Sequence, residues 1–504
     1  MDIRKENKLL LCICICCFFF LIFLRAAKHM EPTAERKEDA TAMEERLELE
    51  QQMYRQMDAS SGAASAGQTE PEPSAEAVNT PEVSDVPENT GTPEAAGAAE
   101  NYQAPLIRIL LTDNSKSGYY QESVTVSSSS AIHLEGSDLT IPAGTSETIT
   151  NGDGRFMDGK IVLTPEDPSA GITVSSLQKA QGPPVYEGSL EIYLTDQGIY
   201  LVNEVNLESY LKYVVPSEMP ASYAAEALKA QAVCARTYAC RQIQDASLED
   251  YHAHVDDSVS FQVYNNIARQ EATDQAVDDT AGQIMTCGGE PITAYFFSTS
   301  CGYTSTNEVW SGGSSEEYLK SVYLGSDDRE DVQTEEVFAS FIQQKDESDL
   351  ESSDGWYRWS VTLPAEVLNQ RIEKYQIGTI QSFQVLKRSS GGAVSSLQVT
   401  GSQGSTTLDN EYAIRELLSV KGIAVTKNDG SVTEDMYLLP SAYFICSAVY
   451  NGSSLTGFSF LGGGYGHGVG MSQNGAAHLA EQGYGWQDIL KYFYENIQLE
   501  TAQA

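Results

Sequence analysis

Residues 206–238 read NLESYLKYVVPSEMPASYAAEALKAQAVCARTY, and the second half of this segment has a clear helical pattern. Small and apolar residues recur there every three or four positions, which predicts a helix over residues 221–242 with one closely packed face. Ser222 is the expected N-cap, and Pro220 prevents the preceding chain from continuing into this helix.

Two cations mark a second stripe of the predicted helix. Lys229 and Arg236 are seven residues apart, so they lie two turns from each other on the same side. Surface ion pairs, for example with Glu226, are the ordinary explanation for such residues. A stripe of two cations in an acidic chain also fits a shared partner.

On both sides of this helix, short apolar runs between Gly, Pro, Asn and Asp predict strands. The expected strands cover residues 105–112, 122–127, 132–139, 160–164, 189–194, 198–205, 281–287, 291–298, 357–362 and 381–387. Further helices are expected at residues 364–372, 411–418 and 472–482. Strands mixed with isolated helices indicate an α+β fold, a mixed, strand-rich domain with a few helices.

The charge balance limits the function. The 504 residues include 71 Asp and Glu but only 31 Lys and Arg, a formal net charge of −40. The excess of acid argues against a nucleic-acid-binding protein and against docking on anionic lipid through a basic face. With 41% hydrophobic residues, the chain can still bury a large core, so global disorder is excluded.

The N-terminal hundred residues predict a membrane anchor and a linker. Residues 9–27 begin with sixteen apolar residues and follow a basic tail at 1–8, which fits a transmembrane helix with a cytoplasmic N-terminus. A cleaved signal peptide is the alternative. Residues 28–103 form a charged stalk and a linker rich in Ala, Pro and Glu, which predicts disorder. The folded region, residues 104–504, would then be extracytoplasmic and held at the cell membrane by a single pass.

The cysteines do not form a disulfide framework. Four of the nine lie in the apolar N-terminal run, and the folded region holds an odd number, five. Cys287 and Cys301 flank an expected strand, and the sequence leaves open whether they pair or stay as thiols.

Four blocks in this order resemble the sporulation stage II protein D family (SpoIID) of peptidoglycan lytic transglycosylases. They are residues 206–238, DDSVSFQVYN at 256–265, TAYFFSTSCGYTSTNEVW at 293–310, and GGGYGHGVGMSQNGAAHLAEQGYGWQDILKYFYENI at 462–497. The resemblance covers roughly residues 105–500 and implies that 104–504 is the catalytic domain. It suggests a role in spore engulfment or in remodelling of the cell wall.

The resemblance implies a specific reaction at Glu218. A lytic transglycosylase cleaves the β-1,4 bond between N-acetylmuramic acid and N-acetylglucosamine, and the muramyl 6-hydroxyl closes a 1,6-anhydro ring. One carboxyl can act first as acid and then as base. Glu218, in VVPSEMP, matches the family's catalytic glutamate. The alternative is a Glu that merely offsets the dipole of the following helix.

Further residues are predicted to bind the substrate. Lys229 and Arg236 match family positions and would contact oxygen groups of the glycan or steady Glu218. Gln231 would hydrogen-bond a sugar, and Tyr303 would stack on one. The remaining predicted substrate-binding residues are Ser298, Ser300, His467 and Gln473.

No metal and no other cofactor is expected. Some family members bind zinc close to the stretch that matches residues 256–264, but this chain has Val255, Ser260 and Phe261 there. His252 and His254 alone are too few for a closed zinc site.

The acidic block at 256–265 has two interpretations. Asp256, Asp257 and Gln262 are expected to support the site by hydrogen bonds. Alternatively, Asp257 is the second carboxylate of a true hydrolase.

Two functions follow from the resemblance. The first is a membrane-anchored lytic transglycosylase acting on the glycan strands of peptidoglycan. The second is a non-catalytic glycan-binding module that recruits or stimulates a cell-wall amidase, as relatives are thought to do. The partners implied are glycan strands, a cell-wall amidase and other membrane proteins, with no nucleic acid.

Overall fold

The computed structural model describes residues 102–502, except 114–117, 259, 312–314, 326–331 and 435. The predicted tail (1–8), the anchor (9–27) and nearly all of the linker (28–103) lie outside the described residues. In the part of the chain that is described, no helix combines the length and the apolar character needed to cross a membrane.

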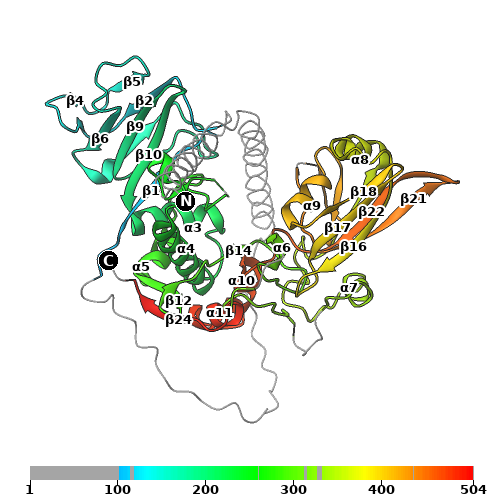
Figure 1. The fold of residues 1–504 in the computed structure, drawn as a ribbon. Helices are drawn as coiled ribbons and strands as arrows, with labels where there is room; N and C mark the ends of the chain where they lie inside the picture. Colours follow the sequence, from blue (N-terminus) through cyan, green and yellow to red (C-terminus); the bar gives the residue numbers. More distant parts are fainter. Residues whose placement is uncertain are drawn as a thin grey trace, which may run out of the picture.

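The first lobe, in blue to green in Figure 1, is built on a seven-stranded sheet in the order β11-β1-β10-β9-β6-β3-β4. In that order the strands are Val255–Asp256, Leu106–Leu110, Gly198–Asn206, Ser189–Thr195, Lys160–Pro165, Ile132–Leu134 and Thr140–Ile141. All neighbours are antiparallel except β1 and β11. Burial alternates along β6, whereas the central strand β10 is buried on both faces over most of its length.

A second sheet shares the core of this lobe. Its order is β5-β2-β7-β8, with bounds Ser146–Thr150, Ser123–Ser127, Ile172–Val174 and Val185–Tyr186, and the short 3-10 turn Pro168–Ala170 precedes β7. Apolar side chains from both sheets, such as Ile109 and Val126, pack in one cluster with the helices described next.

Three helices follow β10. Helix α3 (Leu207–Glu218) starts directly at the end of the strand, where the Asn206 side chain accepts hydrogen bonds from the amides of Glu208 and Ser209. Helix α4 (Ala225–Asp245) packs beside α3, and α5 (Glu271–Asp279) packs against both. The 3-10 turn Glu249–Tyr251 connects α4 to β11.

The C-terminal residues return to this lobe. Strands β13 (Glu290–Pro291), β12 (Gln283–Cys287) and β24 (Gln498–Thr501) form one small sheet. Strand β14 (Phe296–Phe297) pairs in parallel with β23 (Met471–Ser472). Helices α10 (Gln473–Glu481) and α11 (Trp486–Phe493) follow β23 and pack on α4.

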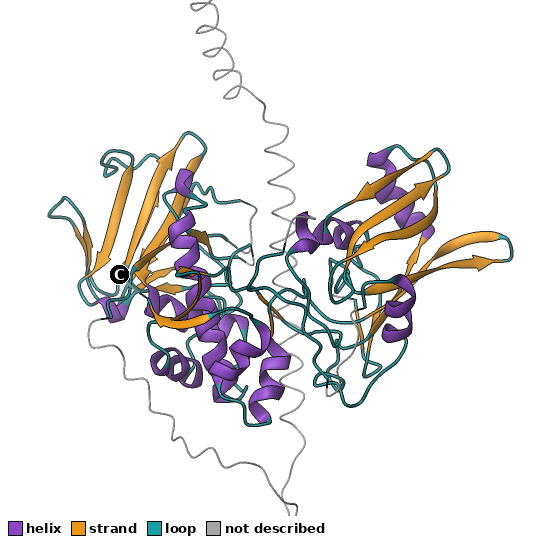
Figure 2. Ribbon diagram, turned by 60° about the horizontal axis from the view of Figure 1, so that its bottom comes forward, coloured by secondary structure: helices purple, strands orange, loops and turns teal. Residues whose placement is uncertain are grey.

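Residues 298–470, called here the inserted region, leave the first lobe after β14 and return at β23. Most of them form the second lobe, which the two views in Figures 1 and 2 show beside the first. A five-stranded sheet has the order β20-β19-β15-β22-β21, and a three-stranded sheet has the order β16-β17-β18. Their bounds, in these orders, are Val432–Thr433, Val425–Lys427, Trp359–Pro364, Ser454–Gly462, Phe444–Asn451, Ile380–Arg388, Val394–Gly401 and Gly404–Leu408. The helices are α6 (Glu308–Ser311), α7 (Glu335–Ile342), α8 (Ala365–Ile372), α9 (Glu411–Leu417) and the 3-10 turn Glu373–Tyr375.

The two lobes share a hydrophobic core. One buried cluster combines side chains of α4, α10 and α11, for example Val233 and Phe493, with Leu324, Phe338 and Tyr443 of the inserted region. The inserted region therefore packs as part of the first lobe as well as around its own sheets.

The mixed, strand-rich α+β fold predicted from the sequence is confirmed, with a few helices among several sheets. Several local predictions are wrong. The single strand expected over residues 291–298 is only the two short strands β13 and β14. Helix α3, which contains Pro216, was not predicted. Ser222 does not cap α4, which starts at Ala225 after Ala224 without a side-chain cap.

Candidate functional site

Glu218 is the last residue of α3, where three distant segments of the chain meet. Its Oε1 accepts a hydrogen bond of 2.7 Å from the backbone amide of Val263. Its carbonyl oxygen accepts one of 2.9 Å from Nε2 of Gln473, the first residue of α10. Helix α4 begins only at Ala225, and Glu226 occupies its first turn. Glu218 is therefore not placed to offset that helix dipole, and the structure brings Glu218 and Gln473 together as predicted.

Side chains of α3 and α4 fix the loop that carries Val263. Gln262, fully buried, donates from Nε2 to the carbonyl of Ala235 and accepts from the hydroxyl of Tyr210. On the other side of the loop, Ser217 Oγ accepts hydrogen bonds from the amides of Asn266 and Ile267. The place of Val263, and with it the Glu218 carboxylate, thus depends on buried hydrogen bonds rather than on a mobile surface turn.

A second polar group joins α10 to the end of β14. Asn474 donates a hydrogen bond from its backbone N–H to the carbonyl oxygen of Ser298 and another from its side-chain Nδ2 to Oγ1 of Thr299, both at 3.0 Å. The Ser298 and Thr299 hydroxyls lie 3.1 Å apart. Ser298 and Gln473, both predicted from the sequence, thus lie on segments that are directly hydrogen-bonded to each other.

A buried acid from the inserted region completes this group. Glu351 Oε1 accepts hydrogen bonds from the Ser300 amide (3.0 Å) and from the Ser472 hydroxyl (2.6 Å). Its Oε2 accepts one from the Ser300 hydroxyl. Burial, and then the charge of Asp354, raise the pKa of Glu351 to about 7. Sequence analysis missed Glu351, because a lone acid in a loop carries no motif.

His467 lies among aromatic rings. Its ring centroid is 5.3 Å from that of Trp310, 5.7 Å from Phe297 and 6.2 Å from Tyr295. Nδ1 accepts a hydrogen bond from the amide of Val469. Burial, and then the charge of Arg415, lower the pKa of His467 to about 3, so the ring is neutral at physiological pH.

A comparison with known proteins identifies the family of the segment around Glu218. A family model described as stage II sporulation protein matches residues 195–287, which contain Glu218 and Val263. Stage II sporulation protein D of Bacillus subtilis is 31% identical over 319 residues, covering 60% of this chain and 77% of that protein. The chain belongs to the stage II sporulation protein D family. The corresponding protein of Bacillus amyloliquefaciens is 29% identical over 66% of this chain and 86% of its own length.

Two further matches concern the rest of the chain. The amidase enhancer of Bacillus subtilis is 32% identical over 304 residues, but this chain covers only 40% of that protein. A second family model, described as a domain of unknown function, matches residues 304–470. This match lies within residues 104–504, for which the sequence predicts one domain.

The two cations that match family positions are engaged inside the protein. Arg236 is fully buried and forms a bidentate ion pair with Glu208 of α3, at 2.7 and 2.8 Å. It also donates to the carbonyls of Val277 and Gln283. Lys229 pairs with Glu226 at 3.0 Å and with Asp279 of α5 at 3.1 Å. The expectation of a glycan contact is corrected for Arg236, whose side chain has no exposed atom. Lys229 has the ordinary ion pairs and stays partly exposed, so its predicted contact with the glycan stays a prediction.

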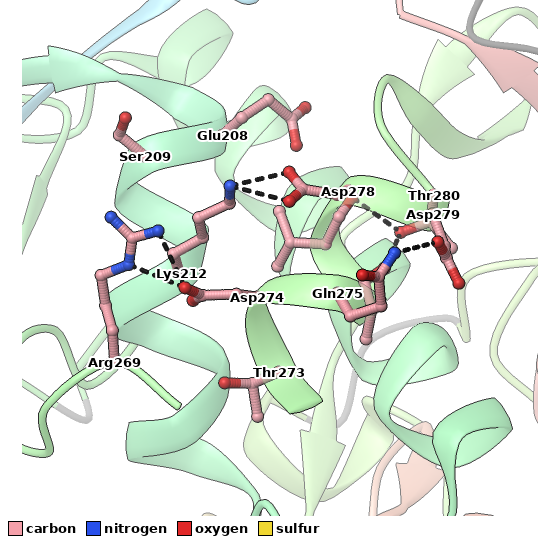
Figure 3. A network of polar contacts seen from close by, with 12 residues as sticks. Glu208, Ser209, Lys212, Arg269, Thr273, Asp274, Gln275, Asp278, Asp279 and Thr280 are labelled. Atoms are coloured by element: carbon pink, nitrogen blue, oxygen red, sulfur yellow. Dashed lines mark hydrogen bonds and ion pairs between the residues drawn. The ribbon is translucent and has the colours of Figure 1, made fainter. Parts of the chain in front are cut away.

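A further ion pair, between Lys212 and Asp278, joins helix α5 to α3. Figure 3 shows Lys212 of α3 bonded to Asp278, Arg269 bonded to Asp274, and Gln275 bonded to Asp279. The stripe of two cations on α4 therefore faces a helix that belongs to the same lobe.

Two other predicted residues are buried. Tyr303 is 3% exposed, and its ring lies against Tyr323 and Phe341. These contacts leave no ring face for a sugar, which corrects the stacking role expected for Tyr303. Gln231 is also fully buried, and neither polar atom of its side chain has a hydrogen-bond partner among the described residues. Ser300, likewise buried, serves Glu351 instead of a ligand.

The acidic block at 256–265 supports the fold. Asp257 forms a buried ion pair with Lys179 at 2.6 Å and accepts two hydrogen bonds from Thr112. Asp256 accepts from Tyr119 and Ser258. These contacts agree with the supporting role predicted for both residues. Both carboxylate oxygens of Asp257 are buried and engaged, which disfavours the alternative of Asp257 as a second catalytic carboxylate.

The histidines considered for zinc have other neighbours. The His252 ring lies 4.6 Å from that of Tyr193, tilted by 40°, whereas Nδ1 of His254 accepts a hydrogen bond from the amide of Arg108. Within residues 102–502 as described, no group of three His, Cys, Asp or Glu residues is placed to hold a metal ion. Cys287 and Cys301 are both free thiols in the structure.

The raised pKa of Glu351 predicts a specific pH dependence of stability. In the unfolded chain this carboxyl titrates near its ordinary value of 4.5, and in the folded protein near 7, so the folded state binds the proton more tightly. The wild type is therefore expected to lose about 3 kcal/mol of stability relative to Glu351→Gln between pH 4.5 and 7, at about 1.4 kcal/mol per pKa unit. Urea midpoints of both proteins at several pH values measure this difference. Parallel curves for the two proteins would contradict it.

Proposed function

We propose that this protein acts on the glycan strands of peptidoglycan as a lytic transglycosylase, with Glu218 as its acid and base. The observation that carries the proposal is the placement of Glu218. This partly buried carboxyl is fixed by the Val263 amide, in the segment that the stage II sporulation family model matches. Gln473 holds its backbone from a different block of the sequence.

The reaction needs only one such carboxyl. Protonated Glu218 gives its proton to the leaving glycosidic oxygen as the bond from that oxygen to muramyl C1 breaks. The ionised carboxylate then takes the proton of the muramyl 6-hydroxyl, whose oxygen bonds to C1 and closes the 1,6-anhydro ring. No water is consumed and nothing is oxidised or reduced. The engagement of Asp257 by Lys179 agrees with a mechanism that uses no second carboxylate.

The aromatic side chains around His467 suit an uncharged, hydroxyl-rich substrate. Trp310, Tyr295 and Phe296 are partly exposed aromatic residues, and pyranose rings pack well on aromatic surfaces. His467 stays neutral and can exchange hydrogen bonds with sugar hydroxyls without adding a charge. The hydroxyl of Ser298 offers a further polar contact.

A second function is favoured by one relative. The amidase enhancer of Bacillus subtilis is 32% identical to this chain, and its name describes stimulation of another enzyme. In this alternative the same residues bind glycan without cleaving it, and a cell-wall amidase is the partner. Under either function, we propose that residues 9–27 anchor the protein in the membrane with the folded region outside the cytoplasm.

The masses of the digestion products distinguish the two functions. Purified glycan strands incubated with the full chain should yield fragments that end in 1,6-anhydro-muramic acid, each lighter by one water than a hydrolysis product. Strands that bind the protein but remain uncut, together with faster release of stem peptides when an amidase is added, would replace the first function by the second. Fragments with ordinary reducing ends would indicate a hydrolase and contradict the proposed reaction.

A further inference from the structure

The inserted region supplies a buried acid to the group of residues around Glu218. Glu351 is fully buried in a loop before β15. It accepts all three of its hydrogen bonds at the two places where the chain crosses between the lobes: two from Ser300, just after β14, and one from Ser472 in β23. One carboxylate thus joins the two chain crossings between the lobes.

Both crossings lead directly to the proposed site. Ser472 is the N-cap of α10, and its hydroxyl accepts from the Gly475 amide while it donates to Glu351. The next residue, Gln473, holds the carbonyl oxygen of Glu218. On the other crossing, Thr299 is bonded to Asn474 and, through its backbone, to Tyr465. A shift of Glu351 would therefore move the first turn of α10 relative to the end of α3.

The chemistry of Glu351 is unusual for a residue that serves stability alone. Among the described residues, no Lys or Arg forms an ion pair with it. Its charged neighbours are Asp354 and His478 of α10. His478 is bonded to Asp354, and this hydrogen bond, together with the charges of Asp354 and Glu351, raises the pKa of His478 to about 9. A buried carboxyl without a directly bonded cation is costly, and an apolar residue of the same size would usually be more stable there. What Glu351 does provide is three directed hydrogen bonds from two segments.

We propose that Glu351 is a positioning residue for the Glu218 site, and that the inserted region, through it, holds α10 in the place that Gln473 needs. The use of glycan cleavage as the measurement rests on the proposed function. The role of Glu351 in holding α10 in place does not. Glu351 touches no reacting atom in this scheme. It acts through Ser472 and Gln473.

Two substitutions separate geometry from charge. In Glu351→Gln, the amide oxygen still accepts from the Ser300 amide and the Ser472 hydroxyl, and the amide nitrogen donates to the Ser300 hydroxyl. In Glu351→Met, the length and volume stay similar but all three hydrogen bonds are lost. Glu191→Met is the matched control, since Glu191 is a 5% exposed acid on β9 that pairs with Arg108.

The experiment compares the full chain and these variants in kcat and KM for glycan strands, below their unfolding temperatures. We expect Glu351→Gln to keep kcat within about twofold and Glu351→Met to lower it by about 10²-fold, the cost of a displacement of about 1 Å. Glu191→Met should lose stability but keep its kcat. A Glu351→Met variant as active as wild type, or a Glu351→Gln variant as impaired as Glu351→Met, would overturn the proposal.

Hydrogen exchange of single amides tests the geometry without any cleavage. The Val263 amide is held by Glu218 and the Ser300 amide by Glu351. Both should exchange faster in Glu351→Met than in Glu351→Gln, whereas Glu191→Met leaves them unchanged. If the wild type does not cut glycan, the proposed function fails and this comparison still decides the role of Glu351. If Glu351→Met does not fold, Ser300→Ala takes its place, since it removes one of the same hydrogen bonds from the other side.

Discussion

Replacing Glu218 by glutamine is expected to lower the rate of glycan cleavage by about 10²- to 10⁴-fold, the range that a general acid–base residue contributes. Glutamine has nearly the same shape, and its amide oxygen can keep the hydrogen bond from the Val263 amide. It can neither give a proton to the leaving oxygen nor take one from the muramyl 6-hydroxyl. The measurement is the rate at which 1,6-anhydro ends appear, per mole of folded protein.

The control for this variant is Glu226→Gln. Glu226 lies in the first turn of α4, close in sequence to Glu218, and bonds Lys229 and the amide of Trp486. The same chemical change there should leave the cleavage rate within about twofold. A Glu218→Gln variant that cuts as fast as wild type would contradict the proposed role of Glu218. Unchanged amidase stimulation by an inactive variant would show that both activities reside in one chain.

Replacing Arg236 by methionine is expected to destabilise the fold by about 3–5 kcal/mol, the cost of leaving one partner of a buried ion pair alone. The guanidinium is fully buried and holds Glu208 of α3 by two hydrogen bonds. It also satisfies the carbonyls of Val277 and Gln283, which would lose their donor in the variant. Urea denaturation at pH 7 measures the change in the free energy of unfolding.

The cleavage rate of the Arg236→Met variant separates the two roles considered for this residue. At a temperature where the variant is folded, we expect the KM for glycan to stay close to that of wild type. A KM raised at least tenfold without loss of stability would restore Arg236 as a substrate-binding residue. Arg241→Ala is the matched control, because the Arg241–Asp245 pair is exposed and worth at most about 1 kcal/mol.

The sequence predicted some elements closely and missed others of similar length. The expected strand 198–205 matches β10, and the four expected helices match α4, α8, α9 and α10. The long strands β17, β21 and β22 of the inserted region were not predicted. Helix α3 was not predicted, and it contains a proline, a residue that usually ends a helix. Here Pro216 is tolerated, since packing of Tyr210, Leu211 and Val214 in the core outweighs one missing hydrogen bond.

The same limit applies to the site. The ordered blocks of sequence identified four candidate site residues that remain candidates: Glu218, Ser298, His467 and Gln473. The structure joins Glu218 directly to Gln473 by a hydrogen bond. Helical spacing showed correctly that Lys229 and Arg236 share one side of α4. It could not show that α3 and α5 of the same lobe cover that side, because periodicity contains no information on which element packs there.

The parallel pair of β14 and β23 has a consequence for how the protein folds. Phe296 pairs with Met471, so this contact closes a loop of about 170 residues, at an entropic cost of about 4–5 kcal/mol if that loop is unstructured. Once the two sheets of the inserted region have formed, its ends are already close and most of that cost is gone. Assembly of the inserted region should therefore precede docking of α10, α11 and β24. The part of the molecule that carries Gln473 would be the last to reach its native place, and the Glu218 site would mature only when the whole chain has been made.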